Sequence, residues 1–273
     1  MKENQFETIK RLDNDGKEYW SSRDLAKALE YADYRNFITV ISKAKTACEN
    51  SGEVIHNHFV EATDMVKLGS GAEKLIDTFF LSRYACYLVV QNSDPTKVVI
   101  AKGQTYFAIQ TRRQEKADSL IEDNNRVKLR EEMKKHNTSL VQTARVAGVE
   151  NFAIFQNHGY KGLYGGLTMK DIHTRKKLGK TQKILDHMNS EELAANLFRA
   201  TQTEAKLKRD GAKTEGEANL AHYYVGQKVR NTIASLGGTM PESLPTVDGI
   251  GKAQTRIKKQ TKAKKIGGKK GKE

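Results

Sequence analysis

The chain lacks several features that define large classes of protein. It has two cysteines, Cys48 and Cys86, in 273 residues, which excludes a disulfide framework and a four-cysteine zinc site. No apolar run approaches the roughly 18 residues that cross a bilayer, and the N-terminus has no apolar segment of the kind found in secretory signals. We therefore expect a cytoplasmic protein without a membrane partner, or alternatively one associated with the nucleoid.

Proline is also scarce, with three residues in the whole chain. Because proline interrupts helices and central strands, its scarcity favours long uninterrupted elements, mostly helices. A length of 273 residues is typical of about two domains. The hydrophobic content of 37% indicates small cores.

Positive charge is abundant and concentrated at the C-terminus. The formal net charge is +14, and residues 252–273 contribute ten Lys or Arg and one acid. A segment of this composition cannot bury a core, so we expect residues 248–273 to be a disordered tail. Such a tail can lie along a polyanion and release its condensed counterions; the alternative is a solubilising tail. The candidate DNA contacts here are Lys258, Lys259, Lys262, Lys264, Lys265, Lys269 and Lys270.

The first 112 residues show mixed strand and helix patterns. Residues 6–12 and 17–20 flank the turn sequence Asp-Asn-Asp-Gly and predict a hairpin. Further strands are expected at 54–60, 64–68 and 77–81, with the glycine-containing loop at 69–71 joining two of them. Helices are expected at 23–30, 33–50, 83–91 (after a Ser82 cap) and from 96 to about 136, the last as one helix or two abutting ones.

The second half reads as mainly helical. Residues 152–166 combine aromatics with glycines, and either form part of a small core or stack on unpaired bases. Thr168 and Asp171 have capping-box spacing. Helices are predicted at 169–178, 180–188, 191–210 and 217–236. The fold class is thus α+β: a small mixed N-terminal domain of hairpins and helices, then a mainly α-helical C-terminal domain and a disordered basic tail.

The helix at 33–50 is the best candidate for nucleic-acid recognition. Its apolar residues recur with helical spacing and predict one buried face. The other face combines short hydroxyl side chains with cations, which can approach a phosphate backbone and base edges; the alternative is an ordinary solvated face. The candidate contacts are Arg35, Thr39, Ser42, Lys43, Lys45 and Thr46, with Arg112 and Arg113 as additional phosphate contacts.

Catalytic signals are weak by comparison. His56 and His58 would share one face of a predicted strand, where two imidazoles could bind a metal with Asp64 or Asp77; the alternative is a pair of surface histidines. The loop at 68–74 lacks the Walker pattern, and no nucleophile elbow, kinase set or dinucleotide fingerprint is present. We therefore predict neither an enzyme nor a cofactor.

Residues 6–115 resemble a Bro-N domain, a DNA-binding module of phage, baculovirus and bacterial regulators. The segments YWSSRDLAKALEYADYRNF (19–37) and LSRYACYLVVQNSDPTKVVIAKGQTYFAIQTRRQE (81–115) are the basis of this resemblance. The wider chain resembles the DNA-damage-inducible protein D family over about 240 residues. The segments of this chain on which the wider resemblance rests are FAIFQNHGYKGLYGGLT (152–168), KILDHMNSEELAANLFRATQTEAKLKRDG (183–211) and LGGTMPESLP (236–245).

This resemblance implies a bacterial protein of the DNA-damage (SOS) response with a DNA-binding N-terminal domain, and it implies no catalytic residue. We expect a Bro-N-like domain at 1–112, a charged helical connector at 113–147, a helical domain at 148–247 and the tail at 248–273. The leading hypothesis is a non-enzymatic DNA-binding protein. One alternative is a protein-interaction module that modulates a repair or recombination complex; another is a metal-dependent nuclease.

Overall fold

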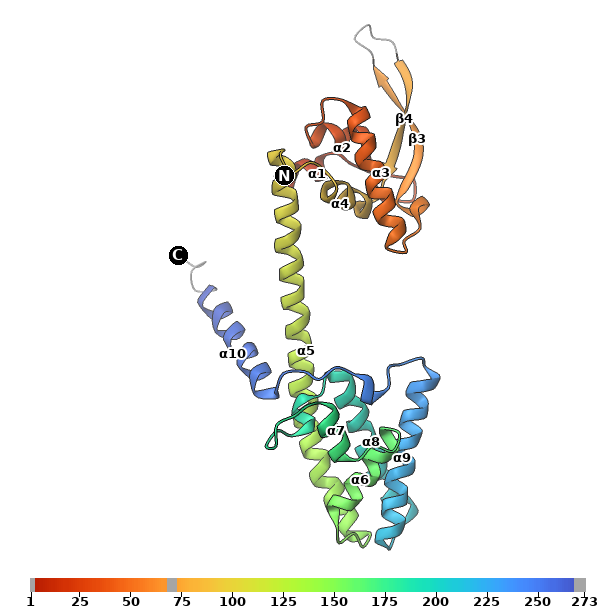
Figure 1. The fold of residues 1–273 in the computed structure, drawn as a ribbon, viewed down its shortest axis with the longest axis vertical. Coiled ribbons are helices and arrows are strands. Elements are labelled where there is room, and N and C mark those ends of the chain that lie inside the picture. The colour runs from red at the N-terminus through yellow and green to blue at the C-terminus, as the bar shows by residue number, and fades with distance from the viewer. Residues whose placement is uncertain (1–2, 68–72, 268–273) are drawn as a thin grey trace. The chain divides into compact units, whose positions relative to one another are not determined.

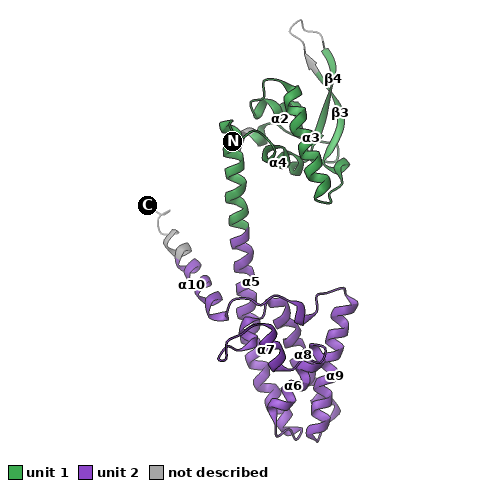
Figure 2. Ribbon diagram, viewed as in Figure 1, with its two compact units in different colours: residues 1–114 green, residues 115–273 purple. Residues whose placement is uncertain are grey.

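The computed structural model describes residues 3–67 and 73–267, and only the backbone of 3–5, 66–67 and 263–267. The chain divides into two compact units, residues 1–114 (unit 1) and residues 115–273 (unit 2), which Figure 2 distinguishes by colour. A small antiparallel sheet with helices forms unit 1, and unit 2 is mainly helical. These two parts of the predicted fold class are confirmed.

Unit 1 is built on a four-stranded antiparallel sheet in the order β1-β2-β4-β3. The strands are β1 (Lys10–Leu12), β2 (Glu18–Ser21), β3 (Phe59–Lys67) and β4 (Glu73–Leu81). Leu81 of β4 lies opposite both Trp20 of β2 and Phe59 of β3. The helices are α1 (Glu3–Thr8), α2 (Ser22–Ala28), α3 (Tyr34–Asn50) and α4 (Arg83–Gln91). Figure 1 shows α3 beside the β3–β4 hairpin.

The core of unit 1 is apolar. Trp20, Leu25, Phe37 and Phe59 are at most 1% exposed, and full burial of such a side chain contributes about 1.5–3 kcal/mol. The Trp20 indole N–H donates to the Phe6 carbonyl at 3.0 Å, and the Phe6 ring stacks on the indole at 4.6 Å between ring centroids. These contacts place Phe6 in α1, so the strand expected at 6–12 begins only at Lys10.

Two other expectations for unit 1 need correction. The strands predicted at 54–60 and 64–68 are a single strand, β3, preceded by the 3-10 turn η1 (Ile55–Asn57). The third predicted strand is longer than expected, because β4 pairs with β3 over nine residues from Glu73 to Leu81. The glycine-containing loop between them lies outside the described residues. The Ser82 cap is confirmed, since its hydroxyl oxygen accepts from the Ala85 N–H at 3.1 Å.

The helix expected from residue 96 is one continuous element, α5 (Val98–Val146), of 49 residues. No glycine or proline occurs between residues 104 and 147, so nothing in this sequence stops the helix. It ends before Gly148, whose φ of 81° is readily adopted only by glycine. The helix spans the boundary between the two units.

In unit 2, α6 (Phe152–Leu163), α8 (Ser190–Asp210) and α9 (Glu215–Ser235) pack with the second half of α5. Glycines allow α6 and α9 to approach closely. A Cβ atom at Gly226 would lie 2.8 Å from the Gly159 carbonyl oxygen and from the Leu163 nitrogen. Phe155, Tyr160 and Tyr164 are at most 4% exposed, so the core interpretation of the aromatic segment 152–166 is confirmed.

The core of unit 2 contains buried charged groups. The Lys176 ammonium lies 2.7 Å from a Glu192 carboxylate oxygen, and the Tyr164 hydroxyl donates to the other oxygen at 2.8 Å. The side-chain amide of Asn196 donates in turn to the Tyr164 oxygen at 2.8 Å. Glu192 and Asn196 are fully buried. Burial raises the pKa of Glu192, although Lys176 and Tyr164 oppose this shift.

The same network continues to α9 through Arg199, which is fully buried. Its guanidinium donates to the Asn196 side-chain oxygen at 3.2 Å and to Nε2 of His222. Since Nε2 accepts, His222 holds its proton on Nδ1, which donates to the Phe155 carbonyl at 3.0 Å. Burial, and then the Arg199 charge, hold the pKa of His222 well below its ordinary value.

Shorter elements complete unit 2. The capping box of α7 (Met169–Arg175) is confirmed, with Thr168 and Asp171 bonded reciprocally. The helix predicted at 180–188 is only the 3-10 turn η2 (Ile184–His187), because residues 179–182 form a loop held by side-chain bonds. A second 3-10 turn, η3 (Pro241–Ser243), follows α9.

The predicted disorder of the basic tail is wrong for residues 250–267, which form α10 (Ile250–Gly267). Its alanine, lysine and glutamine content favours a helix, and two contacts anchor it. Ala253 is fully buried, and Arg256 donates to both carboxylate oxygens of Asp123 at 2.6 and 2.7 Å. Residues 268–273 lie outside the described part of the chain.

Candidate nucleic-acid interface

Helix α3 presents one buried and one exposed face, as its sequence predicts. Its apolar residues are buried in the core of unit 1. The Asp33 carboxylate caps the first turn by accepting from the Arg35 N–H at 2.8 Å. The exposed face bears Arg35, Thr39, Ser42, Lys43 and Thr46. The predicted stripe is thus assembled on one surface.

A polar junction connects the start of α3 to α2 and the sheet. The Ser22 hydroxyl lies 2.5 Å from the Tyr34 hydroxyl and 3.0 Å from that of Thr78. The Arg23 guanidinium stacks 3.9 Å from the Tyr34 ring centroid and donates twice to the Asp77 carbonyl, at 3.0 and 2.8 Å. The short helix α2, the long helix α3 and the β3–β4 hairpin therefore form one connected framework.

The hydroxyl groups on this face differ in what they can donate. Thr39 donates to the Asn36 carbonyl at 2.7 Å, and Thr46 donates to the Ser42 carbonyl at 3.2 Å. Their protons are therefore used within the helix, and only their oxygens remain available as acceptors. Among the described residues, the Ser42 hydroxyl has no hydrogen-bond partner, so it is the available hydroxyl donor of the stripe.

The cations also separate into two kinds. The Arg35 side chain is 93% exposed and lies 3.8 Å from Asp33; Lys43 is exposed as well. Lys45 lies instead 4.0 Å from the centroid of the Phe79 ring and 3.8 Å from Glu61. Its side chain is 26% exposed and packs α3 against the hairpin. Arg35 and Lys43 are therefore the cations of this face that are accessible to an external anion.

The other predicted contacts lie elsewhere. Arg112 and Arg113 are exposed on α5 at the end of unit 1. Lys258, Lys259 and Lys262 are exposed on α10 in unit 2. Lys264 and Lys265 belong to α10, but their side chains fall outside the described part of the chain. Lys269 and Lys270 lie outside the described residues altogether.

The histidine pair does not form the predicted strand site. His56 lies in the turn η1, and His58 follows it, with Nδ1 2.9 Å from the Ser82 hydroxyl and its ring 4.8 Å from the Tyr84 ring centroid. Within the described ranges, no group of three or more His, Cys, Asp and Glu residues could hold a metal ion. The geometric basis of the nuclease hypothesis, two histidines on one strand face, is therefore wrong.

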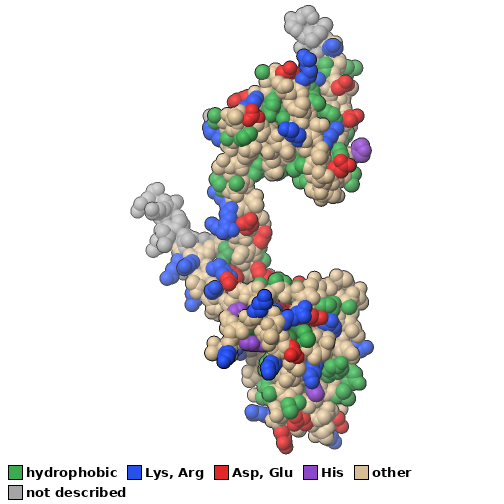
Figure 3. Space-filling view, in the orientation of Figure 1, with side chains coloured by type: hydrophobic (Ala, Val, Ile, Leu, Met, Phe, Trp, Pro, Cys, Tyr) green, Lys and Arg blue, Asp and Glu red, His purple; other side chains and the backbone are tan. Residues whose placement is uncertain are grey.

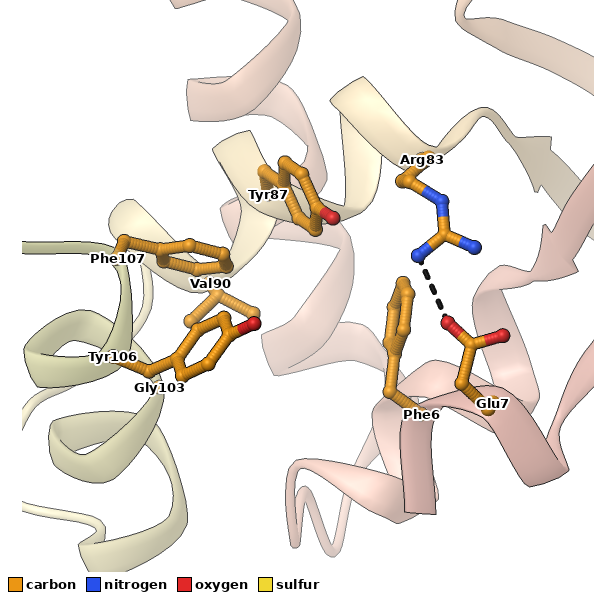
Figure 4. A pocket seen from close by; sticks show the side chains of 8 residues that line it. All are labelled: Phe6, Glu7, Arg83, Tyr87, Val90, Gly103, Tyr106 and Phe107. Carbon is orange, nitrogen blue, oxygen red and sulfur yellow. Dashed lines mark hydrogen bonds and ion pairs between the residues drawn. The ribbon is translucent and has the colours of Figure 1, made fainter. Parts of the chain in front are cut away.

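Unit 1 also contains a cavity of about 370 Å³, and half of the residues that line it are aromatic. Figure 4 shows Phe6 and the Glu7–Arg83 pair on one side of it, with Tyr87, Tyr106 and Phe107 on the other. Arg83 donates to Glu7 at 2.9 Å and to Glu18 at 2.8 Å. Both carboxylates raise the pKa of Arg83. Because this charge is already neutralised, the cavity offers apolar and planar surfaces rather than an anion site.

Sequence reasoning did not identify the junction around Ser22, Arg23 and Tyr34. Arg23 and Asp77 are 54 residues apart, and no periodic pattern relates two such positions. The anchor of α10 was also missed, because Arg256 occurs within a run of basic residues and its partner Asp123 lies in α5. In both cases the contact depends on tertiary structure alone.

Among the described residues, no helix is both long and apolar enough to cross a membrane. Comparison with known proteins gives two family matches. The model described as "BRO family, N-terminal domain" matches residues 6–108, and the model described as "DinD C-terminal domain" matches residues 120–253. The first matched segment lies within unit 1 and the second within unit 2.

The chain is also similar to a curated protein over most of its length. It is 62% identical to DNA damage-inducible protein D of Escherichia coli (strain K12) over 249 residues, which cover 88% of this chain and 91% of that protein. Identity of this extent, together with matches to both domains, establishes the relationship. The chain belongs to the DNA damage-inducible protein D family.

Proposed function

We propose that this chain is a non-enzymatic DNA-binding protein that acts in the bacterial DNA-damage (SOS) response in the cytoplasm. The observation that best supports DNA binding is the exposed stripe of α3, in which the side chains of Arg35, Ser42 and Lys43 are accessible to an external anion. The name of the Escherichia coli relative supports the damage response.

In the proposed mechanism, α3 lies against DNA while α2 and the β3–β4 hairpin hold it in place. Arg35 contacts a phosphate or a base edge, and a bidentate contact to a base is worth about 1–3 kcal/mol. The Thr39 and Thr46 oxygens accept from exocyclic amino groups, and Ser42 donates. The basic α10 adds affinity that does not depend on sequence, because its lysines neutralise phosphates.

Fluorescence anisotropy of the full chain against matched single-stranded and duplex oligonucleotides tests this proposal. Arg35→Ala is expected to weaken binding roughly tenfold or more, which corresponds to about 1–3 kcal/mol. Lys17→Ala removes the same charge from the exposed β1–β2 turn and is the matched control. Equal effects of the two substitutions would exclude α3 as the reading element.

A protein-interaction role is the second candidate, and the exposed apolar residues of unit 2 favour it. Phe198 on α8 is 52% exposed, and Leu220 and Tyr224 on α9 are 52% and 49% exposed. Aromatic side chains of this kind are enriched at protein interfaces. This alternative predicts weak binding to bare DNA and strong binding to a protein-coated filament. That difference should disappear on Phe198→Ala and persist on Arg35→Ala.

A further inference from the structure

The positive charge of the chain is concentrated in unit 2. Residues 1–114 contain 16 Lys or Arg and 15 Asp or Glu, whereas residues 115–273 contain 31 and 18. Unit 1 is thus almost neutral and unit 2 has a net charge of +13. Long-range attraction to a polyanion therefore acts mainly on unit 2, which does not contain α3.

Part of this charge is displayed between α7 and η2. Lys170, Lys177, Lys180 and Lys183 are exposed, and in the described part of the chain none of them forms an ion pair. Two carboxylates lie near them: Asp186 pairs with Arg130 at 2.7 Å, and Asp171, whose capping-box donors are uncharged, keeps its charge and interacts with Lys170. Four lysines against one unneutralised carboxylate leave this part of the surface with a net positive charge.

The loop at residues 176–183 (the α7–η2 loop) is held in place by hydrogen bonds. Nε2 of His173 lies 3.1 Å from the Gly179 carbonyl and 3.2 Å from the Gln182 carbonyl, so this nitrogen holds a proton and donates. The Gln182 side-chain oxygen accepts from the Gly179 N–H at 2.6 Å. Leu178 packs against the core and Ile184, just after the loop, is buried in it. The loop that bears Lys177, Lys180 and Lys183 is therefore held in one conformation.

Helix α10 is fixed to the same framework. Asp123, which accepts twice from Arg256, is only 2% exposed. The buried Arg126 donates to the carbonyls of Met188 at 2.9 Å and Asp186 at 3.0 Å, and also to that of Asp248 at 2.5 Å. One guanidinium thus ties the end of η2 to the residues that precede α10.

The two basic elements border a shared depression. An open groove of about 680 Å³ is lined by Gln182 and His187 on one side and by residues 246–249, 251 and 252 on the other. In Figure 3, Lys and Arg side chains gather over α7 and over α10 on the same face of unit 2. The acid in this lining, Asp248, is paired with Arg256 at 2.8 Å and with Lys252 at 3.5 Å.

We propose that this face is a second nucleic-acid-binding surface, which contacts the phosphate backbone without regard to sequence. We call it the basic face and define it by Lys170, Lys177, Lys180, Lys183, Lys258, Lys259 and Lys262. It lies wholly in unit 2, and the inference does not depend on whether α3 reads DNA.

The composition of the basic face favours nucleic acid over an acidic protein. Lysine is depleted in protein interfaces, whose binding energy comes mainly from buried aromatic and arginine side chains. Apart from the lysines, the exposed positions in the segment 177–183 are small or polar, and none is aromatic. Flexible ammonium groups act as point charges toward phosphates. Each phosphate neutralised on duplex DNA contributes about 0.9 to the salt slope.

The test uses the full chain with Lys170, Lys177, Lys180 and Lys183 all changed to alanine. The control changes Lys206, Lys208, Lys213 and Lys228 to alanine, which removes the same charge from α8, α9 and the turn between them. Affinity for a mixed-sequence duplex is measured from 50 to 200 mM salt. The first variant is expected to lower the slope of log affinity against log salt by about 2–4, and the control by less than 1.

An unchanged slope in the first variant, or an equal change in the control, would overturn the proposal that the basic face binds nucleic acid. If Arg35→Ala then still weakens binding, the proposed DNA binding by α3 is unaffected by that result. If Arg35→Ala has no effect while the lysine variant lowers the slope, the α3 function fails and the basic face stands. Polyglutamate of matched charge is expected to compete poorly with DNA; equally good competition would overturn the assignment to nucleic acid.

A second measurement needs no variant and so does not depend on folding of a mutant. Lysine acetylation of the wild-type chain is followed by mass spectrometry with and without duplex DNA. Acetylation of Lys177, Lys180, Lys183 and Lys259 is expected to fall at least threefold with DNA, while that of Lys206 and Lys213 is unchanged. Equal acetylation at all sites in both samples would overturn the proposal.

Discussion

The cores of the two units differ in the polar groups that they bury. Unit 1 buries an apolar cluster around Trp20 and Phe37, and the polar groups within it are hydroxyls such as Ser22 and Thr78. Unit 2 buries Glu192, Arg199 and His222 completely. An apolar core tolerates substitutions of similar volume, whereas a buried charge must keep its partner. Stability therefore depends on a few specific contacts in unit 2 and on many similar ones in unit 1.

The two units can be followed separately. Trp20 is the sole tryptophan of the chain and is fully buried in unit 1, so its fluorescence reports unfolding of that unit. Circular dichroism at 222 nm is dominated by the helices, most of which lie in unit 2. Urea titrations followed by both signals therefore measure the unfolding of each unit separately.

The largest effect is expected from Glu192→Ala. The substitution leaves the Lys176 ammonium, whose side chain is 6% exposed, without its carboxylate. Breaking a buried pair in this way costs about 3–5 kcal/mol. The dichroism transition should move to lower urea while the Trp20 transition stays in place. Glu191→Ala, at the exposed neighbouring position, should change neither; a shift of both signals by the same amount would contradict the separation of the two units.

Gly159→Ala should be the next most destabilising. A Cβ atom at this position of α6 would clash with the Arg199 guanidinium and the His222 ring, and overpacking of this kind costs about 1–3 kcal/mol. Gly216→Ala is the matched control in α9, because no atom lies within 4 Å of its added Cβ. The control should be neutral or stabilising by less than about 1 kcal/mol. Similar losses in the two variants would argue against a tight Arg199–His222 contact.

In unit 1, Ser22→Ala should destabilise by about 1–3 kcal/mol, since it removes a buried acceptor and leaves its partners unsatisfied. The Ser22 hydroxyl oxygen accepts from the Phe79 N–H at 3.0 Å and bonds Tyr34 and Thr78. The Trp20 transition should move and the dichroism of unit 2 should not. Ser42→Ala, on the exposed face of α3, should stay within about 0.5 kcal/mol of wild type.

The smallest predicted effect is a pH dependence confined to unit 2. The folded-state pKa of His222 is lowered well below 6.5, so below that pH the unfolded chain binds a proton that the folded one does not. Stability should therefore be full above about pH 6.5 and fall on acidification, by at most about 1.4 kcal/mol per pH unit. Urea titrations at pH 7.5 and 5.5 measure this change.

His222→Gln isolates that contribution. The raised pKa of Glu192 acts in the opposite direction, because its stabilising effect is lost as pH rises. The difference between wild type and His222→Gln at the two pH values removes this background. A variant as pH-dependent as wild type would show that another group is responsible.

Much of the secondary structure and part of the candidate interface could be predicted from sequence. The stripe of Phe37, Val40 and Ile41 has a helical period and identifies the buried face of α3 without any tertiary information. Ser82 and Thr168 were recognisable as caps because capping is a local interaction. The positions of Phe6 and of β3 were predicted wrongly, since the stacking on Trp20 and the pairing with β4 are long-range contacts.

The local pattern of the amino-acid sequence by itself determined the α+β class, the helical character after residue 96, the buried face of α3 and the concentration of positive charge toward the C-terminus. These properties follow from spacing and composition over a few residues. Tertiary structure alone decided that Lys45 supports the hairpin while Arg35 is exposed, and that Arg256 anchors a helix where the composition indicated disorder. The physical reason is that a side chain's role depends on the partner it meets: Lys45 packs on Phe79, 34 residues away, and Arg256 bonds Asp123, 133 residues away.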